Sequence, residues 1–328
     1  MSRRWLSGLV PLYAAAVAWR NRGFDDGSKA VRRLRFPVVS VGNLSTGGAG
    51  KTPLTIALAK ALTRRGMRVD VLSRGYGRRS RLAARVDPIG TAEEFGDEPL
   101  LIARETGVPV YVARQRYEAG LLAEAGCAVD VHLLDDGFQH RQLFRDVDIL
   151  LVNSADWQDR LLPAGNLREP LEAARRASVI AIPADVPALE DELRAWDWQG
   201  PVWRLKRTME VPAVDGPVAA FCGIARQRQF FAGLEAGGLA LATRVAFGDH
   251  HRYTRADLER LAASARAAGA TALVTTEKDL VRLGELAAGF AESLQLKTAR
   301  LRIEIEDEDR AIAWLTSRLV EGSTQARL

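Results

Sequence analysis

The sequence is poor in the residues that build disulfide frameworks and metal centres. Its 328 residues include only two cysteines and four histidines. Cys127 and Cys222 lie far apart in apolar surroundings, so we expect two buried thiols in a reducing compartment. Internal repeats and low-complexity tracts are absent as well. With 47% hydrophobic and 27% charged residues, the chain is typical of an ordered globular protein, and its length favours two domains.

A charge-free run near the N-terminus is too short to span a bilayer comfortably. Residues 5–19 carry no charge, whereas a transmembrane helix needs about 20 apolar residues. The run leads into Trp19, Arg20 and Arg22, and such an aromatic and basic flank is typical of a helix that lies in the membrane interface. We therefore predict that residues 1–25 associate with a membrane. The alternative is an amphipathic first helix that packs on the protein's own core.

Positive charge is concentrated in the same region. The whole chain has a net charge of +5 and a pI of about 9.4. Residues 1–35 alone contain eight basic and two acidic side chains. This excess favours acidic partners, but by itself it does not separate nucleic acid from anionic lipid or a phosphorylated substrate.

Hydrophobic patterning predicts strands that alternate with helices. The expected strands are 36–42, 68–73, 108–112, 129–134, 148–152, 179–182, 202–205, 218–223 and 272–276, and helices are expected at 53–62, at 100–105, from about 227 and at 310–319. This order predicts an α/β fold with a mostly parallel sheet, helices on both faces and active groups at the carboxyl ends of the strands. The pattern restarts after residues 196–217. We expect an N-terminal helix at 1–25, a main domain at 26–200 and a smaller α/β lobe at 201–328.

A glycine-rich loop joins the first expected strand to the first expected helix. In this position small residues let backbone N–H groups point at phosphates, and the N-terminus of the helix adds its dipole. Lys51 would reach the β- and γ-phosphates of a nucleotide, and the Thr52 hydroxyl would bind Mg²⁺. Ser45 departs from the usual pattern, which has glycine at its first position. The predicted P-loop consists of Ser45, Thr46, Gly47, Gly48, Ala49, Gly50, Lys51 and Thr52.

Acidic residues at the ends of later segments supply candidates for the rest of a nucleotide site. Asp135 and Asp136 follow an apolar strand, where a carboxylate helps to hold Mg²⁺ in P-loop proteins; read alone, Asp-Asp-Gly also makes a turn. Asp97 starts a helix, where capping is the default role. His250 lies in an expected loop of the second lobe, and a His–Asp pair there would serve as the base that a sugar kinase needs.

Two arginine-containing turns are further candidates. Arg168, followed by Glu169, would stabilise charge on a transferring phosphoryl group, or would form an ion pair in a surface turn. A second turn follows the strand at 68–73 and is rich in arginine. We expect this turn either to contact an anionic substrate or to be exposed to solvent. Its basic residues are Arg74, Arg78, Arg79 and Arg81.

Several motifs together resemble the tetraacyldisaccharide 4′-kinase family of lipid A biosynthesis. The resemblance extends from the N-terminal apolar segment to about residue 283, and the family accepts serine at the position of Ser45. The string Asp-Asp-Gly-Phe-Gln-His is its most specific part. The matching segments are 41–44, 47–53, 73–77, 96–99, 134–140, 162–165, 167–170, 247–250 and 275–279.

The resemblance implies an ATP- and Mg²⁺-dependent kinase at the cytoplasmic face of the inner membrane of a Gram-negative bacterium. It implies transfer of the γ-phosphate to the 4′-hydroxyl of a tetraacylated glucosamine disaccharide 1-phosphate, which gives lipid IVA. The substrate's 1-phosphate would suit the positive N-terminal region. The resemblance also implies roles by position. Lys51 and Thr52 would contact nucleotide and Mg²⁺, Asp135 and Asp136 would act at the metal, Asp97 supported by His250 would activate the hydroxyl, and Arg168 and Glu169 would line the site.

Two other classes of protein share parts of the pattern. Partitioning and metal-insertion P-loop NTPases have a similar loop, but they carry a signature lysine just before the paired glycines, where this chain has Thr46. A nucleic-acid-binding protein would explain the high pI. However, the positive charge lies beside an apolar segment, and the sequence contains no recognised nucleic-acid module. We therefore expect a lipid substrate and a membrane surface as partners, with no nucleic acid and no obligate protein partner.

Overall fold

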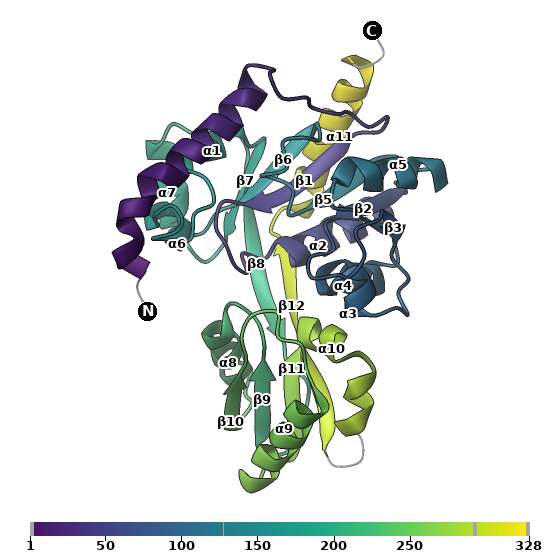
Figure 1. Cartoon of the computed structure of the whole chain (residues 1–328), viewed down its shortest axis with the longest axis vertical. Coiled ribbons are helices and arrows are strands. Elements are labelled where there is room, and N and C mark those ends of the chain that lie inside the picture. The colour runs from purple at the N-terminus through teal and green to yellow at the C-terminus, as the bar shows by residue number, and fades with distance from the viewer. Residues whose placement is uncertain (1–2, 127, 291–293, 326–328) are drawn as a thin grey trace.

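The computed structural model describes residues 3–126, 128–290 and 294–325. Its strands form one twelve-stranded sheet in the order β10-β9-β11-β12-β8-β7-β6-β1-β5-β2-β4-β3. We call the part built on β1 to β7 the first lobe and the part built on β9 to β11 the second lobe. Figure 1 shows the larger first lobe above the second, with long strands running between them.

The first lobe is built on buried parallel strands. At its centre, β1 (Val38–Asn43) pairs in parallel with β5 (Val131–Asp135) on one side and with β6 (Val147–Leu151) on the other. Val, Ile and Leu predominate in these strands because both faces of the sheet are covered. Since the strands are parallel, their carboxyl ends open on one edge. The remaining parallel strands are β2 (Val69–Ser73), β4 (Val110–Val112) and β7 (Val179–Pro183). The two-residue edge strand β3 (Ala84–Arg85) pairs antiparallel with β4.

Helices cover both faces of these strands. On one face α2 (Lys51–Arg64), α4 (Asp97–Thr106) and α11 (Glu308–Gln325) share a single apolar core with the sheet. On the other face α5 (Arg116–Gly126) packs on alternate residues of the same strands. Shorter elements complete the lobe: α3 (Ala92–Phe95), α6 (Ser154–Gln158), η2 (Leu171–Arg176) and α7 (Ala188–Ala195).

Two long strands connect the lobes. β8 (Val202–Glu210) pairs in parallel with β7 and antiparallel with β12 (Gln295–Ile305). β12 continues into the second lobe, where it pairs in parallel with β11 (Ala272–Thr276). The second lobe also contains β9 (Val218–Cys222), β10 (Leu241–Ala246), α8 (Gln227–Ala236), α9 (Arg255–Ala267), α10 (Glu277–Leu283) and η3 (Gly284–Phe290).

The N-terminal segment lies against the outside of the first lobe. A 3-10 turn, η1 (Arg3–Leu9), leads into α1 (Val10–Asp25), which runs diagonally across the view of Figure 1. Within α1 only Val17 and Gly23 are buried, whereas Leu12 is 69% and Trp19 72% exposed. Across the described residues, no helix combines the length and apolar character needed to cross a membrane. The helix therefore rests on the protein through one side and presents apolar side chains on the other.

The fold expected from the sequence is confirmed, including the mostly parallel sheet, the helices on both faces, the smaller second lobe and the N-terminal helix. The domain limits at residues 25 and 200 stay a prediction. One contact bears on them: α11 belongs to the C-terminal part of the chain but packs with α2 in the core of the first lobe. Cys222 is buried as expected, and Cys127 lies outside the described residues.

Candidate active site

The glycine-rich loop lies between β1 and α2, as expected. Gly47 and Gly50 have φ angles of 106° and 98°, in the left-handed region that glycine adopts without steric cost. The loop is tied down on its outer side, because Thr46 donates its backbone N–H to the carbonyl of Asn166 at 2.8 Å. The loop thus has the strand, turn and helix N-terminus that bind phosphate in P-loop proteins.

Lys51 and Arg168 bring two positive charges to this loop. Nζ of Lys51 donates to Oδ1 of Asn43 at 2.9 Å and lies 3.4 Å from Asp136. Arg168 contacts both carboxylate oxygens of Asp136, at 3.0 and 3.1 Å, and also donates to Asn43 at 2.8 Å. The two cations converge on the ends of β1 and β5, where nucleotide phosphates bind in P-loop proteins.

The paired aspartates have opposite electrostatic environments. Burial would raise the pKa of Asp136, but the charges of Lys51 and Arg168 outweigh it and hold that pKa below its ordinary value. Burial raises the pKa of Asp135 to about 7, and the negative charges of Glu98 and Asp136 add to the effect. One oxygen of Asp135, Oδ2, is buried and has no hydrogen-bond partner among the described residues. A nearby cation would therefore stabilise Asp135 more than Asp136.

Few side chains near the phosphate loop could ligate a divalent cation. Among the described residues there is no group of three or more His, Cys, Asp or Glu side chains that would hold a metal by themselves. Thr52 is buried on the first turn of α2. One turn further, Thr55 donates to Oδ1 of Asp135 at 3.3 Å. A hydroxyl and one carboxylate fit Mg²⁺ that takes its other ligands from nucleotide phosphates and water.

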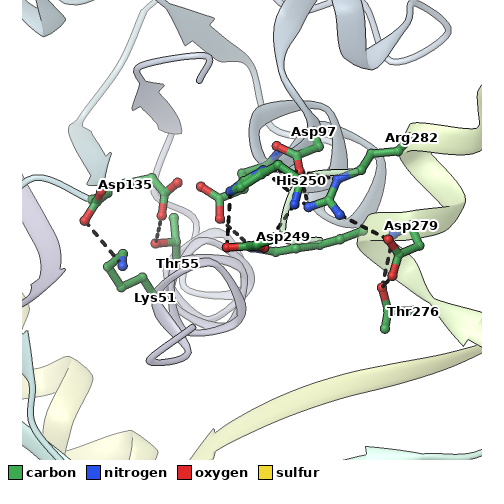
Figure 2. Close-up of polar contacts among 12 residues, drawn as sticks. Lys51, Thr55, Asp97, Asp135, Asp249, His250, Thr276, Asp279 and Arg282 are labelled. Carbon is green, nitrogen blue, oxygen red and sulfur yellow. Dashed lines mark hydrogen bonds and ion pairs between the residues drawn. The ribbon is translucent and has the colours of Figure 1, made fainter. Parts of the chain in front are cut away.

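Asp97 and His250 meet across the two lobes. Asp97 is the first residue of α4 and is 5% exposed. His250 lies in the loop that follows β10, with a φ of 57°. Its Nδ1 lies 3.1 Å from Oδ2 of Asp97, as Figure 2 shows. The hydrogen bond to Asp97 raises the pKa of His250. The structure thus places side by side two residues that are 153 positions apart.

Arg282, which no sequence motif singled out, completes this cluster. From α10 its guanidinium group reaches Oδ2 of Asp97, with Nε at 2.7 Å and Nη2 at 2.5 Å. Burial would raise the pKa of Asp97, but the hydrogen bond from His250 and the charges of Arg282 and Lys278 outweigh it and lower that pKa. Asp97 is therefore ionised at neutral pH. Its other oxygen, Oδ1, accepts the backbone N–H of Glu98 at 3.0 Å.

Arg282 is itself held by a buried carboxylate of the second lobe. Nη1 of Arg282 lies 3.0 Å from Oδ1 of Asp279, one turn earlier on α10 (Figure 2). Asp279 is fully buried and accepts hydrogen bonds from the hydroxyl groups of Thr276, at 2.6 Å, and Tyr253, at 2.9 Å. The spacing of Asp279 and Arg282 by three residues places both on one helix face. The acidic and basic residues spaced three apart, which follow directly from the matching segment 275–279, are the one sequence signal that could have revealed the cluster.

A second ion pair between the lobes lies next to the one that Arg282 forms with Asp97. Lys278 donates to Glu98, which follows Asp97 in the chain. Both partners of this pair are about one quarter exposed. Lys278 and Glu98 are also among the charges that act on Asp135. The charged groups around Asp97 and those around the phosphate loop therefore belong to one electrostatic environment, and Figure 2 shows the two sets in one view.

Glu169 lies next to Arg168 in the chain but faces the other way. Its carboxylate is fully buried and accepts hydrogen bonds from Asn21 of α1 at 2.7 Å and from Arg176 at 2.8 Å. Arg20 of α1 lies 3.4 Å away. A catalytic role for Glu169 thus stays a prediction, whereas its contacts show that it anchors the N-terminal helix beside the site.

The chain was compared with known proteins. Residues 2–320 match the family described as tetraacyldisaccharide-1-P 4′-kinase. Curated relatives named tetraacyldisaccharide 4′-kinase include one from Koribacter versatilis, 42% identical over 94% of this chain and 96% of the relative, and one from Aquifex aeolicus, 37% identical over 90% and 95%. The crystal structure of LpxK from Aquifex aeolicus in complex with ATP is also similar, with 33% sequence identity and a TM-score of 0.77. The match covers 97% of this chain and 100% of the Aquifex aeolicus chain. This chain therefore belongs to the tetraacyldisaccharide 4′-kinase family.

Proposed function

We propose that this protein transfers the γ-phosphate of ATP to the 4′-hydroxyl of a tetraacylated disaccharide 1-phosphate, forming lipid IVA in lipid A biosynthesis. The observation that carries the proposal is the convergence of two half-sites. The phosphate loop with Lys51 and Arg168 forms one, and the Asp97–His250 pair forms the other. A nucleotide hydrolase of the partitioning type needs only the first half-site. A kinase also needs a group that accepts the proton of the attacking hydroxyl.

The nucleotide half-site supplies charge and hydrogen-bond donors. ATP, which the Aquifex aeolicus neighbour binds, would lie with its phosphates against the backbone N–H groups of residues 45–52. Lys51 and Arg168 would turn from Asp136 to the β- and γ-phosphates. Their charges then stabilise the negative charge that spreads over the transferring group in the transition state.

Mg²⁺ fits the residues at the start of α2 and the end of β5. Thr52 would hold it through its hydroxyl, and Asp135 through the buried oxygen that has no partner in the described structure. A role for Asp136 as a second ligand stays a prediction, because its carboxylate already forms ion pairs with Lys51 and Arg168. When bound, the ion would supply positive charge that offsets the negative charge of the nucleotide phosphates.

The second half-site activates the acceptor. Oδ2 of Asp97 is fixed by His250 and Arg282, and Oδ1 keeps acceptor capacity beyond its hydrogen bond from Glu98. The 4′-hydroxyl would donate a hydrogen bond to Asp97 and lose its proton to it as the oxygen attacks phosphorus. His250 and Arg282 hold the carboxylate of Asp97 in the orientation that proton transfer from the hydroxyl requires.

Acceptor-dependent turnover tests this function. Purified protein with Mg-ATP should release ADP much faster when the disaccharide 1-phosphate is present in detergent micelles than in micelles alone. The reason is that the transition state requires the acceptor oxygen next to Asp97. ADP release at one rate with and without acceptor would instead fit a nucleotide hydrolase.

Arg282→Gln should lower kcat by about 10- to 100-fold, because a misplacement of about 1 Å in a reacting group has this effect. The affinity for ATP should remain within about twofold, since Arg282 lies in the second lobe. Arg282→Lys keeps the charge but loses the paired contacts to Asp97 and should recover only part of the rate. Steady-state kinetics with ATP and acceptor varied separately measure the split. An Arg282→Gln enzyme with wild-type kcat would remove this residue from the positioning of Asp97.

We further propose that α1 brings the enzyme to the cytoplasmic face of the inner membrane. An acylated acceptor stays in the bilayer, so the site must approach its surface. The exposed apolar residues of α1, with basic residues at both ends of the segment, suit the interface with anionic lipid. Contacts of Asn21 and Arg20 with Glu169 place this helix next to Arg168 and hence beside the site.

Leu12→Asp and Trp19→Asp should weaken binding to vesicles that contain phosphatidylglycerol by about 10-fold or more each, because each puts a charge in place of an apolar side chain that would enter the membrane interface. Vesicle co-sedimentation measures the change. Leu121→Asp on α5 is the matched control, since Leu121 is also exposed, at 47%, and lies on a different helix. Equal binding of all three variants and the wild type would mean that α1 does not contact the bilayer.

A further inference from the structure

The side of α1 that faces the protein carries polar side chains as well as apolar ones. Its buried and half-buried residues recur every three or four positions, so they form one stripe along the helix. They include Tyr13, Val17, Arg20, Asn21 and Phe24. Apolar residues are what a helix needs to rest on a protein core, whereas polar residues in such a stripe require partners.

Two of these polar residues bond to the segment that contains Arg168. The hydroxyl of Tyr13 donates to the carbonyl oxygen of Arg168 at 2.9 Å. The side-chain amide of Asn21 donates to the fully buried carboxylate of Glu169 at 2.7 Å. The carbonyl of Arg168 and the N–H of Glu169 belong to one planar peptide group. The helix therefore holds the chain on both sides of this peptide group.

The phosphate loop holds Arg168 from the other side. The backbone N–H of Arg168 donates to the carbonyl of Leu44 at 2.7 Å, and its Nε donates to the carbonyl of Ser45 at 3.1 Å. The rest of the guanidinium group contacts Asn43 and Asp136. The main chain of Arg168 is thus fixed between α1 and the start of the phosphate loop, and the direction of its side chain depends on both.

A further contact joins α1 to the segment that contains Asp136. Arg141 follows the string Asp-Asp-Gly-Phe-Gln-His at 135–140. Its guanidinium group donates to the carbonyl of Asn21 at 3.1 Å and to Oδ1 of Asp25 at 2.6 Å. Arg168 and Asp136 form an ion pair beside the phosphate loop. The helix therefore contacts both of the chain segments that supply this pair.

We propose that Tyr13 and Asn21 are positioning residues for Arg168, which makes α1 a structural part of the phosphoryl-transfer site. The inference rests on the proposed function, in which Arg168 stabilises the negative charge of the transferring group. Tyr13 fixes the backbone carbonyl of Arg168 and Asn21 fixes the adjoining carboxylate, so that the guanidinium group stays directed at the phosphates. The opposite side of α1 exposes Leu12 and Trp19. One helix thus presents apolar residues outward and holds Arg168 inward.

Tyr13→Phe should lower kcat by about 10-fold, because the carbonyl of Arg168 loses its hydrogen bond and the guanidinium group is no longer fixed. KM for ATP and for the acceptor, and binding to phosphatidylglycerol vesicles, should stay within about twofold of wild type, since only one hydroxyl is removed from the inner side of α1. Asn21→Leu should act in the same direction. Tyr117→Phe on α5 is the matched control, because Tyr117 packs its ring, and not its hydroxyl, under the guanidinium group of Arg32.

A double-mutant cycle separates positioning of Arg168 from a general loss of stability. Arg168→Gln alone should lower kcat by about 10²- to 10³-fold, the effect of removing one donor from a site where negative charge develops. Adding Tyr13→Phe to Arg168→Gln should change kcat by less than about twofold, because the group that Tyr13 positions is already absent. Single-turnover rates at saturating ATP and acceptor measure all four enzymes of the cycle.

Two results would overturn the proposal. The same loss of kcat from Tyr13→Phe with and without Arg168 would mean that Tyr13 acts independently of this arginine. A Tyr13→Phe enzyme with wild-type kcat would remove Tyr13 from the positioning of Arg168, and weaker vesicle binding by that enzyme would assign it to membrane association instead. Both results come from active enzyme and leave the proposed function standing. Wild-type protein that forms no phosphorylated lipid would contradict the function itself, and the role of Tyr13 would fall with it.

Discussion

Asp97→Asn is expected to lower kcat by about 10²- to 10⁴-fold, the usual contribution of a positioned general base. Asparagine has nearly the same shape and can still contact His250 and Arg282, but it cannot take the proton of the 4′-hydroxyl. ATP affinity should change little, because the phosphate loop lies on other elements of the first lobe. Single-turnover rates and ATP titration measure the two effects separately.

The control for this substitution is Asp191→Asn. Asp191 is largely exposed on α7, so the same chemical change there should leave kcat and the thermal midpoint of unfolding unaltered. His250→Ala should follow Asp97→Asn in direction with a smaller effect, since His250 supports the carboxylate. An Asp97→Asn enzyme that turns over at the wild-type rate would remove Asp97 from proton transfer.

Lys51→Met is expected to lower kcat by about 10²- to 10³-fold, the effect of removing one preorganised donor from a site where negative charge develops. ATP should also bind more weakly, because the same ammonium group contacts the bound phosphates in the ground state. Asp136 would keep only its contacts with Arg168, so its pKa should rise. The measurements are the single-turnover rate at saturating ATP and the dissociation constant for ATP.

Lys60→Met is the matched control on the same helix. Its ammonium group lies 3.4 Å from Glu105, and the Lys60 side chain is 39% exposed, so loss of this pair should cost at most about 1 kcal/mol of stability and leave turnover unchanged. If both lysine variants lost activity equally, the effect would come from the stability of α2. If neither lost activity, Lys51 would have no role in phosphoryl transfer.

The phosphate loop and the paired aspartates could be predicted because their signals are local. A β-branched strand, glycines and a helix start specify the loop over a few residues, and Asp135 ends an apolar strand. Neighbouring parallel strands then bring these segments to one edge of the sheet by the geometry of the fold. The family expected from the motifs is confirmed by a match that extends over residues 2–320.

The other half of the site depends on packing between distant segments. Arg282 contacts Asp97 although the two residues are 185 positions apart in the sequence. They meet because β8 and β12 place α10 against α4. Glu169 shows the opposite case. Its position beside Arg168 predicts a shared site, and that role stays a prediction; its buried carboxylate contacts Asn21 of α1. Sequence neighbours can face opposite ways, and no local pattern in this segment records which way they turn.

The N-terminal helix shows what patterning leaves open. Residues 5–19 carry no charge, so the sequence could not decide between a helix packed on the core and one facing a membrane. Tyr13 donates its hydroxyl to the carbonyl of Arg168 at 2.9 Å, while Leu12, its neighbour, is exposed. The helix divides its apolar residues between the protein and the outside, which only the packed structure reveals.

Identification of the reaction product tests the central claim most directly. Purified protein is incubated with Mg-ATP and the tetraacylated disaccharide 1-phosphate, and the lipid is analysed by mass spectrometry and ³¹P NMR. The account predicts a lipid with one added phosphate group, located at the 4′ position, and one ADP formed for each lipid converted. Unchanged lipid together with ADP and free phosphate, from protein that is folded and binds ATP, would contradict it.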